Sequence, residues 1–484
     1  MSDPQLAMET VIGLEVHAEL LTQAKIFCGC SARFGAPANT NVCPVCLGMP
    51  GVLPVLNRRV VEFAVRAGLA TNCEIAPLSR WARKNYFYPD LPKGYQITQY
   101  ELPICLRGHI DIAVDGRERR IGLTRIHMEE DTGKNIHDAH QDASLVDFNR
   151  SGVPLLEIVS EPDLRTPGEA GAYLRALRSI LQYLEICDGN MEEGSFRCDA
   201  NVSVRHQGAT ALGTKIEIKN MNSFRAVEKA IAFEIERQCE ALASGEPLVQ
   251  ETRLWDADRE ETRPMRSKEH AHDYRYFPDP DLLPLLVEQG WVEAVRQSLP
   301  ELPVARARRF VDQFQLAPAD AEILTQRRDV ADYFEDGVRA GANPKEMANW
   351  VMTDLLRIIR EEKLDHAPVI RAWPFTATQL AQLVRLVEVG TINRNTAKQL
   401  LPRLRGTNAD PATIVQAEGL GQVSDRGALE AAVQDVITKC PAQVTEFKAG
   451  KEKILGFLVG QVMKATGGKA NPQVVQDLLR AALR

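Results

Sequence analysis

The sequence predicts an α+β protein, in which a strand-rich region up to about residue 295 is followed by helical segments. Three observations support this class. Apolar and polar residues alternate with a period of two in several segments of the first 220 residues, as in half-buried strands. Only two clear amphipathic helices interrupt this region. From Leu299 onward the apolar residues recur at helical spacing, with a second break at residues 402–411.

The predicted strands carry ionisable side chains on the face opposite their apolar residues. In residues 13–20, Leu14, Val16, Ala18 and Leu20 alternate with Glu15, His17 and Glu19. Residues 196–205 and 215–219 alternate in the same way, and residues 126–131 contain four more ionisable groups. A solvent-facing surface would explain one such strand. Several strands of this kind in one sheet indicate a wall of carboxylates that holds cations.

Two helices are predicted within this region from their end signals. The first follows Thr166-Pro-Gly-Glu169, which offers an N-cap, a proline at the first helical position and a glutamate at the third. Its apolar stripe predicts core packing. The second begins after Ser223 and ends at Gly245, a typical C-terminal glycine.

Length and composition limit the class of protein. A chain of 484 residues is too long for one core, and two to four domains are expected. No apolar run approaches the roughly 18–20 residues of a membrane span, and the N-terminus lacks the regions of a secretion signal. We therefore expect a cytoplasmic protein without membrane contact. Its net charge of −7 does not by itself indicate nucleic-acid binding.

Four of the ten cysteines form two close pairs, Cys28/Cys30 and Cys43/Cys46. Two short pairs on tight turns can supply the four thiolates of a tetrahedral zinc site. The alternatives are coincidence or a redox pair at Cys43 and Cys46. The spacing favours a structural zinc, because a site with four cysteine ligands is closed and has no position for a substrate.

The last 40 residues differ in charge from the rest of the chain. From Thr445 to Arg484 there are seven Lys or Arg and three acidic residues, a net charge of +4. Lys464 and Lys469 flank a Gly-Gly loop between two predicted helices. This loop suits a phosphate backbone and equally suits a solvated surface. Neither a P-loop nor a G-x-G-x-x-G fingerprint occurs, so a nucleotide would not be held in those ways.

Mg²⁺ prefers carboxylates, waters and substrate phosphates as ligands. A wall of carboxylates with one histidine could therefore hold Mg²⁺ and the phosphates of ATP, and nearby cations such as Lys84 and Arg197 could neutralise the charge on a transferred phosphoryl group. The residues alone favour a metal- and phosphate-handling enzyme. The competing hypothesis is a tRNA- or protein-binding scaffold whose acidic residues are structural.

Seven motifs along the chain closely resemble the B subunit of the tRNA-dependent amidotransferase GatCAB. They are VIGLEVH (11–17), RKNYFYPD (83–90), HMEED (127–131), LEIVSEP (156–162), RCDAN (197–201), DYRYFP (273–278) and GFLVGQVMKA (456–465). The resemblance extends from about residue 10 to residue 484 in the family's order.

This resemblance implies three domains. Residues 1–296 would form a cradle around an antiparallel sheet, similar to the catalytic fold of glutamine synthetase, with the zinc loop at 28–46. Residues 297–406 would form an all-α helical domain, and residues 407–484 a small helical tail domain that binds tRNA, where Lys464 and Lys469 are the expected nucleic-acid contacts.

The implied reaction is the ATP-dependent phosphorylation and amidation of the side-chain carboxylate of Glu-tRNA(Gln), Asp-tRNA(Asn) or both. Ammonia would come from glutamine through a partner amidase, the A subunit, in a heterotrimer with a C subunit. No serine or cysteine amidase constellation is recognisable in this chain, in keeping with that division. The alternative is a non-catalytic tRNA-binding scaffold subunit of the same kind of complex.

The resemblance also implies roles for individual residues. His17, Glu130 and Glu157 would be the ligands of one Mg²⁺, with Glu129 able to replace Glu130 because adjacent strand residues face opposite ways. A second cluster on the nucleotide side would contain Glu15, Asp199 and Glu217. Lys84 and Arg197 would contact phosphates of the bound ATP.

Overall fold

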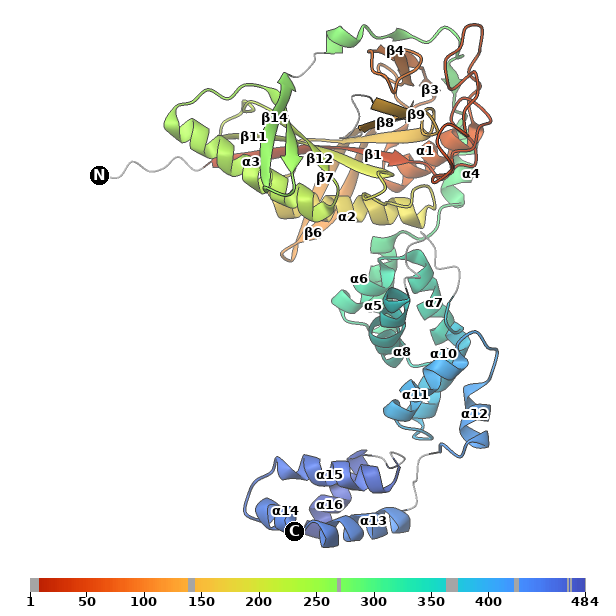
Figure 1. Ribbon diagram of the computed structural model, residues 1–484, viewed down its shortest axis with the longest axis vertical. Helices are drawn as coiled ribbons and strands as arrows, with labels where there is room; N and C mark the ends of the chain where they lie inside the picture. The colour runs from red at the N-terminus through yellow and green to blue at the C-terminus, as the bar shows by residue number, and fades with distance from the viewer. Residues whose placement is uncertain are drawn as a thin grey trace, which may run out of the picture. The chain divides into compact units, whose positions relative to one another are not determined.

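The computed structural model describes residues 8–137, 144–267, 271–362, 373–421, 426–467, 470 and 472–483. The chain divides into two compact units, Met1–Leu302 and Pro303–Arg484, each considered by itself. The first unit combines sheets and helices, and the described part of the second is helical (Figure 1). An α+β protein was predicted, and the coarse class is confirmed, since the protein combines a large sheet with many helices.

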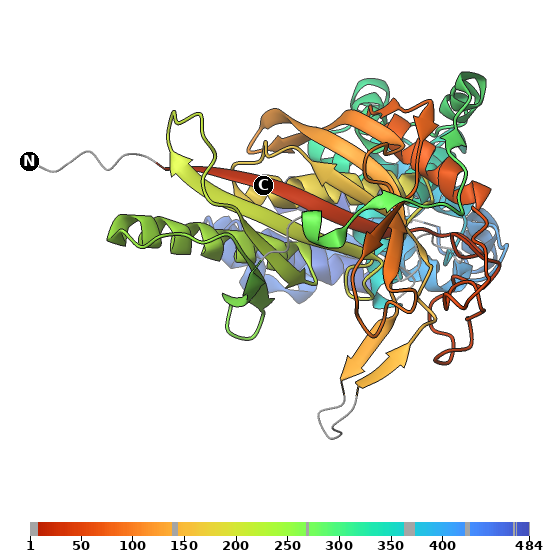
Figure 2. The same cartoon turned by 90° about the horizontal axis from the view of Figure 1, so that it is seen from above.

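The first unit is built around a nine-stranded sheet with β1 at its centre (Figure 2). In spatial order the strands are β14 (Glu261–Ser267), β13 (Glu251–Asp256), β12 (Ile216–Met221), β11 (Phe196–His206), β1 (Met8–Glu19), β10 (Pro154–Ser160), β7 (Arg117–Glu130), β6 (Cys105–Val114) and β2 (Glu74–Ile75). The sequence of β1 explains its central place. Leu14, Val16 and Ala18 on its apolar face are almost completely buried, while the other face carries the acidic residues.

The sheet is antiparallel except at one pair of strands. β12 and β13 run parallel, with Glu217 opposite Thr252. Parallel neighbours cannot be joined by a tight turn and need a crossover connection, and helix α3 (Phe224–Ser244) provides it here. The expectation of an antiparallel sheet is therefore corrected at this edge.

Helices cover the apolar face of the sheet. α1 (Arg58–Ala70), α2 (Pro167–Tyr183) and α3 contact strands β6, β7, β11 and β12, and with them form one continuous hydrophobic core. In Figure 1, α2 and α3 lie along one side of the sheet. The predicted N-cap of α2 and the predicted end of α3 are confirmed, because Thr166 accepts a hydrogen bond from Glu169 N and Gly245 ends α3 with φ 75°. Ser223 caps the start of α3 by accepting from Ala226 N.

Smaller sheets lie beside the large one. Their strands are β3 (Leu78–Ser79), β4 (Ala82–Asn85), β5 (Tyr95–Thr98), β8 (Lys134–His137), β9 (Ser144–Asp147), β15 (Phe277–Pro278) and β16 (Leu285–Leu286). β4 pairs with both β5 and β15, so segments nearly 200 residues apart in the sequence meet. The 3₁₀ helix η1 (Ala271–Tyr274) precedes β15, and α4 (Gln289–Gln297) closes the unit.

The second unit contains two separate hydrophobic clusters. One is built from buried residues between Phe310 and Val415, and the other from buried residues between Leu429 and Leu483. The helical elements are α5 (Pro303–Phe314), α6 (Pro318–Thr325), α7 (Arg328–Arg339), α8 (Pro344–Trp350), the π-helical η2 (Val351–Leu355), α9 (Leu356–Glu361), α10 (Ala377–Glu388), α11 (Arg394–Leu404), α12 (Pro411–Ala417), α13 (Arg426–Lys439), α14 (Pro441–Lys448), α15 (Ile454–Ala465) and α16 (Pro472–Leu483). The predicted boundaries at 296/297 and 406/407 stay predictions.

Among the described residues, no helix has the length and apolar character needed to cross a membrane.

Candidate functional site

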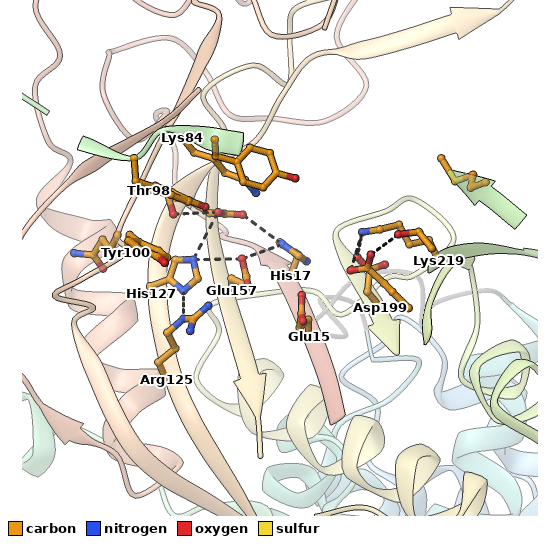
Figure 3. Close-up of a pocket in the computed structure, with 17 residues that line it drawn as sticks. Glu15, His17, Lys84, Thr98, Tyr100, Arg125, His127, Glu157, Asp199 and Lys219 are labelled. Carbon is orange, nitrogen blue, oxygen red and sulfur yellow. Dashed lines mark hydrogen bonds and ion pairs between the residues drawn. The ribbon is translucent and has the colours of Figure 1, made fainter. Parts of the chain in front are cut away.

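A cavity of about 360 Å³ lies on the polar face of the large sheet (Figure 3). Strands β1, β7, β10, β11, β12, β13 and β14 line it, together with side chains from β4 and β5 and from the segment after β14. Successive side chains of a strand point to opposite faces of the sheet. Glu15 and His17 therefore point toward the cavity, because their neighbours Leu14, Val16 and Ala18 are buried in the core on the other face. The cavity is therefore the place where the polar face of the sheet is enclosed.

Strand register brings residues distant in sequence to the same position on this face. His17 lies opposite Glu157 of β10, which in turn lies opposite His127 of β7. On the other side of β1, Glu15 lies opposite Asp199 of β11. The ionisable residues thus form a row across neighbouring strands.

His17, Glu129 and Glu157 form a compact group. The Nε2 atom of His17 is 3.4 Å from Glu129 Oε1 and 3.4 Å from Glu157 Oε2. One ligand atom from each of the three residues lies within 4.8 Å of the others. Two carboxylates and an imidazole at this separation can hold a divalent cation.

The structure places Glu129 in this group, where the sequence favoured Glu130. The Glu130 carboxylate points away from the cavity, accepts a hydrogen bond from the backbone of Ile97 (2.8 Å) and pairs with Lys93. The physical reason is the strand period, since neighbouring residues of β7 face opposite sides of the sheet. The predicted trio is revised accordingly, with Glu129 replacing Glu130.

Burial and neighbouring charges have opposite effects on the pKa values of the residues in this group. Burial would lower the pKa of His17, but Glu157 and Glu129 outweigh it and the pKa is raised. Burial would raise the pKa of Glu157, but His127 and His17 hold it well below its usual range. Glu129 receives a further hydrogen bond from Thr98 Oγ1 (3.3 Å). At neutral pH, Glu157 is therefore ionised and lies beside both histidines.

Glu15, Asp199 and Glu217 also line the cavity, on strands β1, β11 and β12. Lys219 forms ion pairs with both Asp199 and Glu217, with its Nζ 2.5 Å from Asp199 Oδ2 and 3.7 Å from Glu217 Oε1. Burial would lower the pKa of Lys219, but Asp199 and Glu217 raise it, so the side chain is an ammonium ion. A positive charge already lies among these carboxylates.

Side chains with hydroxyl or amide donors orient these carboxylates. Asn201 Nδ2 donates to Glu15 Oε1 (2.8 Å), and Thr252 Oγ1 donates to Glu217 Oε2 (2.8 Å). Each donor occupies one carboxylate oxygen and fixes the orientation of the group. This kind of support is typical of sites whose ligands are held in place by a second layer of residues.

The two predicted phosphate contacts have different surroundings. Lys84 lines the cavity, with its Nζ 4.8 Å from the centre of the Tyr274 ring and 5.7 Å from that of Tyr86. Arg197 is not among the residues that line it. Its Nη2 is 2.9 Å from Asp131 Oδ2, and the charges of Asp131 and Glu19 raise its pKa although burial would lower it.

Four further residues that the sequence did not single out line the same cavity, namely His127, Arg125, Tyr100 and Tyr276. The Nε2 atom of His127 is 3.3 Å from Glu157 Oε2, and Glu157 and Glu129 raise its pKa to about 9 although burial would lower it. Arg125 and His127 precede Glu129 at spacings of four and two residues on β7. Because these spacings are even, Arg125, His127 and Glu129 lie on the same face of β7, and this alternation is the sequence signal that could have identified them.

The four cysteines of the predicted zinc loop come together. Sulfur atoms of Cys28, Cys30, Cys43 and Cys46 all lie within 4.8 Å of one another. A hydrogen bond from the Cys28 thiol, with a smaller contribution from Lys25, lowers the pKa of Cys46 to about 4. Four thiols at this separation fit the four-sulfur coordination that a structural zinc requires.

Fold and site together define a class of protein, a mixed α/β protein with a carboxylate- and histidine-lined cavity suited to a divalent cation and phosphates. Residues 10–293 match the family described as the GatB/GatE catalytic domain, and residues 332–483 match the GatB domain. The chain belongs to this family of amidotransferase B subunits, and the resemblance seen in the sequence is confirmed.

Similar proteins span the whole chain. Three relatives, each named as the B subunit of an aspartyl/glutamyl-tRNA(Asn/Gln) amidotransferase, come from Thermodesulfovibrio yellowstonii (55% identical), Solidesulfovibrio magneticus (58%) and Geobacter sulfurreducens (57%). In each comparison the match covers 98% of this chain and 99% of the relative.

Proposed function

We propose that this chain catalyses the ATP-dependent amidation of glutamate or aspartate misacylated onto tRNA(Gln) or tRNA(Asn). Full-length similarity to amidotransferase B subunits supports the reaction. The observation that carries the proposal is the row of ionisable groups in one cavity, from Glu217 through Glu15 and His17 to Glu129. A scaffold that only carried tRNA would not need carboxylates held this close together in an enclosed site.

The reaction needs activation because a carboxylate has no good leaving group. A side-chain carboxylate oxygen forms a bond to the γ-phosphorus of ATP, and the bond from that phosphorus to the β,γ-bridging oxygen breaks to release ADP. Ammonia then attacks the acyl carbon, phosphate leaves, and the nitrogen loses a proton to give the amide. The first barrier lies largely in bringing two anions together.

The residues of the cavity suit that difficulty. His17, Glu129 and Glu157 would hold one Mg²⁺, which neutralises charge on the phosphoryl group when bound. Glu15, Asp199 and Glu217 would form the nucleotide side, where Lys219 offers a phosphate contact if its pairing with Asp199 opens. Lys84 provides a further cation within the cavity.

Arg197 fits a supporting role better than direct phosphate contact. Its guanidinium group is already paired with Asp131, which is buried and follows the end of β7. We infer that this pair holds the end of β7, and with it Glu129, in position.

The finer architecture and partners belong to the same proposal. The first unit would be a cradle related to glutamine synthetase, followed by a helical domain at 297–406 and a tRNA-binding tail at 407–484. Lys464 is exposed at the end of α15 and suits a phosphate contact, whereas Lys469 lies outside the described residues. The complex would be cytoplasmic and contain A and C subunits, with ammonia from the A subunit. Cys28, Cys30, Cys43 and Cys46 would bind one structural Zn²⁺.

ADP formation by the reconstituted complex tests the proposal. Ammonia serves as nitrogen donor, and Glu-tRNA(Gln), Asp-tRNA(Asn) or uncharged tRNA is added in separate reactions. We expect ADP only with a misacylated tRNA, and the one that supports it identifies the substrate. Absence of ADP with both, in a complex that still hydrolyses glutamine, would favour the scaffold alternative.

A further inference from the structure

Arg125 projects from β7 into the cavity, as does His127 (Figure 3), and Glu129 of the same strand also lines it. Its Nε lies 3.4 Å from Nδ1 of His127. Within the described part of the chain, no Asp or Glu oxygen lies within 4.0 Å of its guanidinium nitrogens. This is unusual in a cavity lined by five carboxylates.

Two other cations near the cavity are paired with carboxylates, whereas Lys84 lies over the rings of Tyr274 and Tyr86. Lys219 lies between Asp199 and Glu217, and Arg197 pairs with Asp131. A guanidinium group stays charged at all physiological pH values and has five N–H donors, which match two oxygens of a carboxylate or phosphate. Because Arg125 is half-buried and turned toward the cavity, its remaining donors are available to an anion of the substrate.

The reaction brings together two anions, the phosphates of ATP and the carboxylate of the acceptor amino acid. The position of Arg125 on the sheet indicates which of the two it would contact. Arg125 lies on β7, three strands from Asp199 on β11 and four from Glu217 on β12. With neighbouring strands about 4.8 Å apart, these separations are roughly 14 Å and 19 Å. His17 and Glu157 lie on β1 and β10, the strands between these ends, and Glu129 lies on β7 with Arg125. If the nucleotide phosphates occupy the end with Lys219, the acceptor carboxylate lies at the end with Arg125.

The surroundings of Arg125 also suit an amino-acid side chain. The rings of Tyr100 and Tyr276 stack with their centres 4.1 Å apart at an angle of 5°, and both line the cavity. They offer an apolar wall for methylene groups beside the guanidinium group. Apolar contact at one side and a charged donor at the other match the chemistry of a glutamate or aspartate side chain.

We propose that Arg125 binds the side-chain carboxylate of the misacylated amino acid, an inference that rests on the proposed function. The planar fork can donate to both carboxylate oxygens, and each oxygen keeps a further lone pair, so one of them can still attack the γ-phosphorus. The same contact selects the substrate against the product, because a neutral amide cannot neutralise the guanidinium group and leaves a charged donor poorly paired. Arg125 is thus both a substrate-binding and a specificity-determining residue.

The test compares wild type, Arg125→Gln and Arg125→Lys in the complete complex. Binding of Glu-tRNA(Gln) and of its product Gln-tRNA(Gln) is measured in the absence of ATP, with ester-stable analogues of both. Wild type is expected to prefer the glutamyl form by about tenfold or more. Arg125→Gln is expected to reduce this preference to about one. Arg125→Lys keeps the charge but lacks the planar fork, and should retain part of the preference.

Arg120→Gln is the matched control. Arg120 lies on the same strand outside the cavity and pairs with Asp111 on the exposed surface, so the preference and the KM for ATP should not change. An Arg125→Gln complex that keeps the wild-type preference overturns the inference. A raised KM for ATP with an unchanged preference also overturns it and assigns the guanidinium group to the nucleotide.

Two further results separate the possible failures. If wild type forms no ADP that depends on misacylated tRNA, the proposed function itself fails. If the Arg125→Gln complex does not assemble, the Arg125→Lys complex tests the inference instead. A wild-type preference for Glu-tRNA(Gln) together with a wild-type rate of ADP formation in that variant would contradict recognition by the planar fork.

Discussion

Glu129 and Glu130 are neighbours on β7, but their carboxylates have different partners. Glu129 lies beside His17 in the cavity, 3.4 Å away, whereas Glu130 pairs with Lys93 on the other side of the sheet. Both members of the Lys93–Glu130 pair are more than nine-tenths buried. A substitution of Glu129 is therefore expected to affect activity, and a substitution of Glu130 to affect stability.

Glu129→Gln keeps the size of the side chain and removes its charge. We expect ADP formation to fall by about a hundredfold or more, because loss of one metal ligand costs several kcal/mol of transition-state stabilisation. The dependence of the rate on Mg²⁺ concentration should shift to higher concentrations. Steady-state ADP assays across an Mg²⁺ titration measure both effects.

Glu130→Gln is the matched variant. It leaves Lys93 buried without a carboxylate partner, so we expect the free energy of unfolding to fall by about 3–5 kcal/mol. A folded Glu130→Gln protein that loses Mg²⁺-dependent ADP formation, while Glu129→Gln retains it, would reverse the assignment.

At the residue scale, the sequence allowed one histidine and several acidic residues of the cavity to be predicted. Glu15, His17, Glu157, Asp199 and Glu217 all line it, because strict alternation on a strand determines which face a residue occupies. The choice between Glu129 and Glu130 could not be made in this way. Glu130 is an acidic residue on a buried face, and its partner Lys93 is remote in the sequence and revealed only by the fold.

At the element scale, the loop that carries Cys28, Cys30, Cys43 and Cys46 has almost no regular structure of its own. Its backbone is tied to the rest of the unit by a few hydrogen bonds, such as Ile26 N to Gly152 O at 3.0 Å. A metal ion held by the four sulfurs would supply cross-links that the loop otherwise lacks.

Cys43→Ser should therefore remove the metal. We expect about one equivalent of zinc in purified wild-type protein and a much smaller content in the variant, because three thiolates bind zinc more weakly than four. Elemental analysis of protein purified without added metal measures this. Cys239→Ser, which changes a lone cysteine on α3, should keep its zinc. A well-folded wild type that contains no metal would contradict the assignment.

Helices α5 and α7 of the second unit are joined by an ion-pair network. Arg306 and Arg309 of α5 both pair with Glu335 of α7, the latter at 2.7 Å. Burial alone would raise the pKa of Glu335, but hydrogen bonds from the two arginines lower it below its ordinary value of 4.5. An acid whose pKa is lower in the folded state stabilises the fold above its ordinary pKa and loses that effect as pH falls through the folded-state value.

Glu335→Gln should remove this pH dependence. We expect the variant to be less stable than wild type between about pH 6 and pH 7, with the difference shrinking below about pH 4. Thermal unfolding at a series of pH values provides the comparison. A stability difference that grows on acidification would contradict the predicted sign.

Elements with local end signals were predictable, whereas long-range pairings were not. The N-cap at Thr166 and the terminal glycine Gly245 helped to identify α2 and α3, because such residues lie within a turn of the helix they bound. The pairing of β4 with β15 and the parallel contact between β12 and β13 depend on segments brought together by the whole fold. Nothing in the local sequence of these short strands specifies their partners.

At the scale of the whole molecule, apolar side chains are gathered in separate cores. One lies in the first unit, and two lie in the second, built from residues 310–415 and 429–483. The resemblance to the family predicted three domains. Length and composition alone had limited the number of domains only to between two and four. Cores that share no side chains can melt independently, so a single melting temperature would describe this chain poorly.

Calorimetry of the full chain should therefore show more than one transition, and the variants above should separate them. We expect Cys43→Ser to lower the transition of the unit Met1–Leu302 and leave the others within error, because its effect is confined to a loop of that unit. Glu335→Gln at pH 7 should lower a transition of the unit Pro303–Arg484 instead. One cooperative transition that both substitutions shift equally would mean that the two units unfold together, and that zinc loss in the first would then destabilise the helices of the second.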